Sequence, residues 1–184
     1  MNLRLALLKR AAPRFVKIRL LDELARATAT GFGSAQPPWI SRSFEARLEE
    51  YARFTAAQAG RVMAADDPSR IEAAKQRLRR QATELGANVR RRLRLTRPTD
   101  AVVALSILYG HLGIDMHAGA AGEIVVRRCL FADYFTEPVC RVVAALDEGM
   151  AAGLSGGGRL EFIERITGGA GCCRARFDVA GTGS

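Results

Sequence analysis

The sequence predicts an α+β fold, with a helical N-terminal half followed by a small antiparallel sheet packed on a helix. Two observations predict this class. As far as Gly113, apolar residues recur at the helical spacing of about 3.6 residues. Beyond Gly113 they alternate with a period of about two in short segments, on either side of one further helical stretch.

Four helices are expected before Gly113, because apolar residues repeat at helical spacing in each, and the last three repeats also follow residues that suit the start of a helix. Glycines and a Pro-Pro pair in "GFGSAQPPW" (31–39) interrupt the repeat after the first helix. The expected helices cover residues 14–29, a stretch after Ser41 or Ser43, a stretch after Asp67 with Pro68 in its first turn, and a stretch after Thr99 or Asp100.

The second half is expected to hold two hairpins around one helix. Glycine-containing turns join the strand candidates in pairs. The strand candidates are "IDMHA" (114–118), "EIVVRRC" (123–129), "RLEFIERI" (159–166) and "CCRARFDV" (172–179), and the helix covers 137–154. We therefore predict an N-terminal helical extension and linker (1–40) and one α+β domain (41–184), helical over 41–112 and with sheet and helix over 113–179.

Composition narrows the function classes. Lys+Arg is 28 and Asp+Glu is 19, which gives a net charge of +9. Nearly all the basic residues are arginines, and no aromatic residues interleave with the arginine run at 75–97, so nucleic-acid binding is not favoured. No apolar stretch is long enough for a membrane helix, and no secretory signal is recognisable. Four scattered cysteines favour a cytoplasmic location, and a homo-oligomer stays open.

Three cysteines could meet in the second half. Cys129 ends a strand, Cys140 lies in the first turn of a helix, and alternation turns Cys173 toward the core and Cys172 away from it. They could be a nucleophile, ligands of a divalent metal such as zinc, or small buried core residues. The helix N-terminus predicts a lowered pKa for Cys140, and Asp147 lies on the same side of that helix.

The segments "LYGHLGID", "VVRRCLFADYF", "ALDEGMAAGL" and "GGAGCCRARF" together resemble the L-2-amino-thiazoline-4-carboxylic acid hydrolase family. The similarity covers roughly residues 80–179 and extends more distantly to vinyl-reductase-like small-molecule-binding domains. Leu130 and Ala175 replace a proline and an aromatic residue of the family pattern, and Cys172 is extra. The matching positions are Cys129, Phe131, Cys140, Gly149, Gly153, Gly171, Cys173 and Phe177.

The resemblance implies hydrolysis of a C–N bond in a cyclic, thiazoline-like carboxylic acid; the alternative is a non-catalytic small-molecule- or metal-binding module. The substrate and the cofactor stay open, with zinc held by the three cysteines as one option. Either histidine, His111 or His117, could be a general base, although a structural role fits both. The candidate catalytic residues are Cys129, Cys140, Cys173, Asp147 and His111, and the candidate substrate contacts are Arg127, Arg128, Phe131 and Tyr134.

Overall fold

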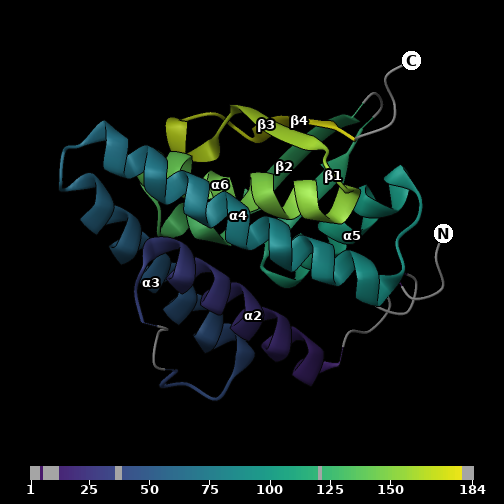
Figure 1. Cartoon of the computed structure of the whole chain (residues 1–184), viewed down its shortest axis with the longest axis horizontal. Coiled ribbons are helices and arrows are strands. Elements are labelled where there is room, and N and C mark those ends of the chain that lie inside the picture. The colour runs from purple at the N-terminus through teal and green to yellow at the C-terminus, as the bar shows by residue number, and fades with distance from the viewer. Residues whose placement is uncertain (1–4, 6–12, 36–38, 120–121, 180–184) are drawn as a thin grey trace.

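The structure is a computed structural model of the 184-residue chain and describes residue 5 and residues 13–35, 39–119 and 122–179. It is an α+β fold with a helical N-terminal half and a four-stranded antiparallel sheet, as the sequence predicts (Figure 1). The elements are α2 (Arg14–Phe32), α3 (Phe44–Met63), α4 (Pro68–Leu93), α5 (Pro98–His111), β1 (Ile114–Ala118), β2 (Glu123–Cys129), η2 (Leu130–Asp133), α6 (Glu137–Ser155), β3 (Arg159–Glu164), η3 (Ile166–Gly168) and β4 (Cys173–Asp178).

The helix starts follow from local side-chain chemistry in two of three predicted cases. The Ser43 hydroxyl accepts a hydrogen bond from the Ala46 N–H at 3.1 Å, and Asp67 Oδ1 accepts from the Ser69 N–H at 2.9 Å. The prediction of a Thr99 or Asp100 cap for α5 is wrong. That helix begins at Pro98, so Asp100 lies inside its first turn and is buried.

The sheet has the strand order β1-β2-β4-β3, so both predicted hairpins form and β2 and β4 join them. One irregularity matters for the site. Asp115 pairs with Arg128 and Met116 pairs with Val126, which leaves Arg127 as an extra residue in β2. This bulge reverses the alternation after Val126, and Cys129 consequently pairs with the buried Ile114 and packs against the core.

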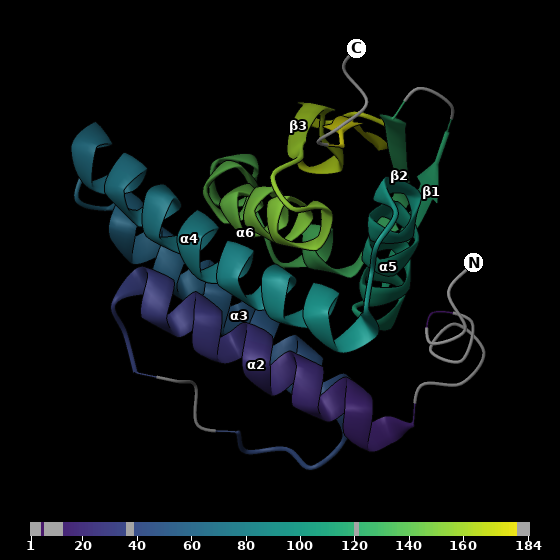
Figure 2. The same ribbon diagram turned by 45° about the vertical axis from the view of Figure 1, so that its right-hand side comes forward.

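The elements form layers, with α6 between α4 and the sheet (Figure 2). Helix α2, which we expected to be an extension, contributes Leu21 and Leu24 to the same core cluster as Ile124 of β2 and Phe177 of β4. It therefore belongs to the body of the fold. Within the described part of the chain, no helix combines the length and apolar character that crossing a bilayer requires.

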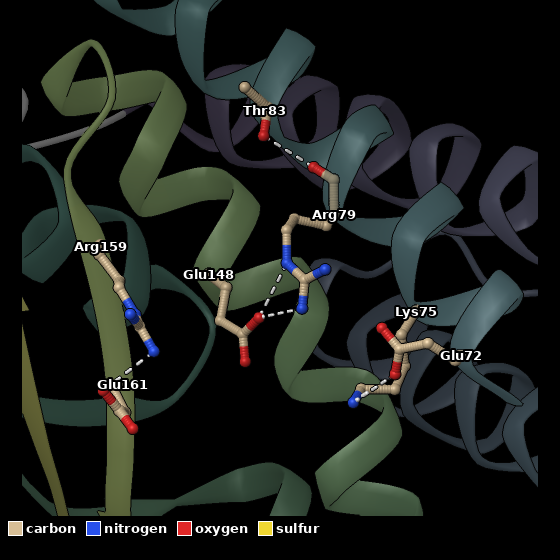
Figure 3. Close-up of polar contacts among 7 residues, drawn as sticks. All are labelled: Glu72, Lys75, Arg79, Thr83, Glu148, Arg159 and Glu161. Atoms are coloured by element: carbon tan, nitrogen blue, oxygen red, sulfur yellow. Dashed lines mark hydrogen bonds and ion pairs between the residues drawn. The ribbon is translucent and has the colours of Figure 1, made fainter. Parts of the chain in front are cut away.

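Helix α4 packs along α6 more extensively than any other pair of elements. An ion pair flanks this contact: Arg79 Nη2 lies 2.6 Å from Glu148 Oε2 (Figure 3). Other arginines of α4 also bond to neighbouring elements, since Arg92 Nη1 lies 2.8 Å from Glu23 Oε2 of α2 and Arg77 Nε donates to the Gly31 carbonyl at 3.0 Å. Some arginines of the run at 75–97 thus form polar contacts between α4 and the neighbouring helices α2 and α6.

Candidate functional site

A cavity of about 110 Å³ lies where α2, α3, α5 and α6 meet the end of β2. Most of its lining is aliphatic or aromatic, and no Lys, Arg or His is among the described residues that line it. This combination of an apolar wall with a few polar groups is typical of small-molecule sites. The main apolar lining residues are Leu20, Leu24, Leu108, Phe131, Val143 and Met150.

Among the described residues that line this cavity, only Asp147 of α6 carries a carboxyl group. Burial raises its pKa from 3.8 to about 6, against the opposing effect of a hydrogen bond from the Tyr109 hydroxyl to Asp147 Oδ1. Asp147 keeps some accessible surface although protein surrounds it, as expected of a side chain that faces a cavity. A carboxyl group with a pKa near neutrality can both accept and donate a proton, so Asp147 is suited to acid–base chemistry.

The thiols lie near this carboxyl group but differ in position. Cys129 and Cys140 line the cavity together with Asp147, whereas Cys173 is not among the lining residues. Cys173 Sγ instead accepts a hydrogen bond from the Ile166 N–H at an N–S distance of 3.3 Å. A negative charge on Cys173 would nevertheless raise the pKa of both other thiols, so the three cysteines belong to one region of the fold.

The predicted lowering of the Cys140 pKa is wrong. Burial raises the pKa of Cys140, of Cys173 and of Cys129, and for Cys129 the value reaches about 12. At Cys140 desolvation raises the pKa more than the helix N-terminus lowers it, because a buried thiolate is held away from water. The negative charge of Asp147 raises the Cys140 pKa further. The three thiols are therefore neutral near pH 7, which argues against a thiolate nucleophile.

The zinc alternative finds no support in the side-chain arrangement. Among the described residues, no group of three or more His, Cys, Asp or Glu side chains is placed to hold a metal ion. Cys129, Cys140 and Cys173 are therefore not arranged as a metal-binding set.

Of the four expected substrate contacts, only Phe131 lines the cavity. Arg127 and Arg128 are exposed, because the β2 bulge lies at Arg127 while Cys129 turns inward. Tyr134 is half-buried, and its ring lies 5.4 Å from the Arg53 guanidinium. A carboxylate bound in this cavity would therefore not contact the two β2 arginines, and their expected role in substrate binding stays a prediction.

His111 does not join this group either. It lines a separate hollow between α2, α4 and α5, and Leu20 and Leu108 line both spaces. Burial and the nearby charge of Lys17 lower the pKa of His111, so its imidazole is neutral near pH 7. His117, an exposed residue of β1, lies beside Asp115 with Nε2 3.1 Å from Oδ1.

Sequence reasoning missed three polar residues of the cavity wall: Tyr51, Thr55 and Tyr109. Tyr51 and Tyr109 recur with apolar residues at helical spacing in two of the expected helices, and this pattern predicts core positions for both. A buried tyrosine usually needs a hydrogen-bond partner. Two of the chain's three tyrosines at core positions therefore indicated that polar groups lie in this core. Nothing in the sequence singled out Thr55.

Comparison with known proteins adds no relative to this picture. No protein-family model, no curated protein and no solved structure matches the chain.

Proposed function

We propose that this chain binds a compact cyclic small molecule in the cavity beside Asp147. The observation that carries the proposal is the burial of a carboxyl group, with a pKa of about 6, in the wall of an otherwise apolar cavity. An apolar cavity of about 150 Å³ can hold benzene, so a space of about 110 Å³ suits a five-membered ring with few substituents. The neutral thiols favour binding over thiolate catalysis.

Filling the cavity tests this proposal. Ala144 lines the cavity from α6, and Ala144→Leu would place three further carbons inside it. We expect isothermal titration calorimetry with small heterocycles to show binding by the unchanged chain and at least a tenfold loss in Ala144→Leu. Ala152→Leu, on the same helix but outside the cavity lining, is the matched control and should bind as the unchanged chain does. Equal binding by Ala144→Leu, in a variant whose circular dichroism shows it folded, would contradict the proposal.

A second candidate is hydrolysis of a ring C–N bond, and the pKa of Asp147 favours it. In this reaction ionised Asp147 takes a proton from a water molecule as the water oxygen attacks the ring carbon. Asp147 then returns that proton to the ring nitrogen as the C–N bond breaks, so the net change is the addition of one water. The resemblance to thiazoline carboxylate hydrolases is consistent with this chemistry and supplies the substrate class to test first.

Turnover separates the two candidates. With 2-aminothiazoline-4-carboxylate, proton NMR would show the loss of the ring signals if the chain is a hydrolase. We expect the rate to rise with pH through about 6 as Asp147 ionises, and Asp147→Asn to lower it by a factor of a hundred or more. Cys140→Ala should retain most of the rate because its thiol is neutral. Binding of ring compounds without turnover would exclude hydrolysis of this substrate and support the binding function.

A further inference from the structure

The polar side chains that line the cavity can be sorted into hydrogen-bond donors and acceptors. Thr28 Oγ1 donates its only hydrogen to the Leu24 carbonyl at 2.9 Å, so in the 2.9 Å contact between Thr28 and Tyr51 the tyrosine hydroxyl must be the donor. The Tyr109 hydroxyl donates to Asp147. Both phenol hydrogens are therefore used, and the two tyrosine oxygens are left as acceptors.

The Asp147 carboxyl group adds further acceptor capacity. Tyr109 bonds to Oδ1, and within the described residues no donor bonds to Oδ2. The ionised carboxylate can only accept hydrogen bonds. Above the pKa of about 6, Asp147 is ionised, and its Oδ2 can accept a hydrogen bond that no described residue donates.

Thr55 is a third feature of the wall. It is completely buried and lines the cavity, yet among the described residues its hydroxyl has no partner at hydrogen-bond geometry, although it lies close enough to Tyr51 to lower that phenol's pKa. A buried hydroxyl without a partner is costly, and a ligand that bonds to it removes the cost. Thr55 lies on α3 and Asp147 on α6, so these groups approach a ligand from different elements.

We infer that the cavity takes a ring carrying a positively charged N–H group, a cyclic amidine or a cyclic amine, rather than a carboxylate. The inference rests on the proposed binding function and deepens it. Among the described residues, the wall offers one carboxylate, two phenol oxygens that can accept and the Thr55 hydroxyl, and none of these lining residues is basic. A charged N–H group donates to Asp147, and the apolar remainder of the ring contacts the hydrophobic lining.

Other ionisable groups near Asp147 do not reverse this preference. Glu148 has the same sign of charge, and the three thiols are neutral near pH 7. Arg165 is the nearby cation that affects the Asp147 pKa, but it does not line the cavity, and its guanidinium lies 5.0 Å from the centre of the Phe162 ring. The groups that affect Asp147 or lie in the same wall are thus Tyr51, Tyr109, Glu148, Arg165, Cys129, Cys140 and Cys173.

Three five-membered ring probes test the inference by calorimetry: 2-methylimidazoline as the cation, thiophene as the neutral ring and thiophene-2-carboxylate as the anion. At pH 7.5 we expect the cation to bind at least tenfold more tightly than either other probe. Its affinity should fall about tenfold at pH 5, where only about a tenth of Asp147 is ionised. Thr55→Val, which keeps the shape of the side chain, should lower the affinity for the cation several-fold and leave the affinity for thiophene unchanged.

Two variants locate the charge that matters. Asp147→Asn should remove the preference for the cation and its pH dependence while thiophene still binds. Glu148→Gln is the matched control. Glu148 is the next residue of α6, pairs with Arg79 and does not line the cavity, so this variant removes a carboxylate outside the proposed site. The preference should survive in it.

The outcomes separate this inference from the binding function. Binding of thiophene without a preference for the cation would overturn the inference and leave the binding function standing, as would tighter binding of the carboxylate. A preference that Glu148→Gln abolishes as fully as Asp147→Asn would also overturn it. If no probe binds at millimolar concentration, both the inference and the binding function fail.

Discussion

At pH 8 the Asp147→Asn variant is expected to unfold with a free energy about 3 kcal/mol larger than that of the unchanged chain, and at pH 4 the difference should fall below about 1 kcal/mol. The reason is the cost of holding a charged carboxylate away from water. Burial raises the pKa of Asp147 to about 6 from 3.8, so the folded state keeps a proton that the unfolded state has already lost. Asparagine removes the charge and can still accept the hydrogen bond from Tyr109.

The pH range follows from the two pKa values. Below 3.8 both states carry the proton, and Asp147 costs no stability. As pH rises from about 4 to about 6, only the unfolded state ionises, and the free energy of unfolding of the unchanged chain falls. Above about 7 both states are ionised and the loss is complete.

Urea unfolding at pH 4, 6 and 8 measures this effect. Asp133→Asn, at an exposed position in η2, provides a matched control and should change the free energy of unfolding by no more than about 0.5 kcal/mol at any pH. A difference between Asp147→Asn and the unchanged chain that is the same at all three pH values would show that the carboxyl group titrates normally. That result would also remove the basis for its acid–base role.

The sequence predicted the fold well because local signals carried most of it. Helical spacing, the Asp67-Pro68 start and the strand alternation each act over a few residues, and together they located the start of every α-helix and strand of the described chain from α2 onward to within a few residues. The two 3-10 helices, η2 and η3, were not predicted. The errors came where tertiary structure decides. The cap of α5 is one, since Asp100 is buried inside the helix rather than placed before it.

The site was harder to predict because its properties depend on burial and register. Helical spacing correctly placed Asp147 on the same side as Cys140, and both line the cavity. The bulge at Arg127, which turns Cys129 inward, depends on how β1 and β2 pair and leaves no mark in the sequence of β2. The Cys140 pKa was predicted in the wrong direction because the helix N-terminus is visible in the sequence whereas desolvation is not.

The second large effect concerns the contact between α4 and α6. Gly149→Ala and Gly153→Ala are each expected to lower the free energy of unfolding by about 3 kcal/mol or more. A Cβ at Gly149 would lie 2.2 Å from the Arg79 carbonyl oxygen, and one at Gly153 would lie 2.2 Å from that of Thr83. Both atoms are backbone atoms of α4, so no side chain can rotate away and the helices must separate.

Gly60→Ala in α3 is the matched control, because a Cβ there meets no atom within 4 Å. It should raise the free energy of unfolding by about 0.5–1 kcal/mol, since alanine favours a helix more than glycine does. Urea unfolding of the three variants compares steric overlap with helix propensity directly. A gain in stability at Gly149 or Gly153 similar to that at Gly60 would show that α4 and α6 lie farther apart than the structure has them. Because Asp147 lies only two residues before Gly149, separation of these helices should also weaken binding of the ring probes in the two destabilised variants.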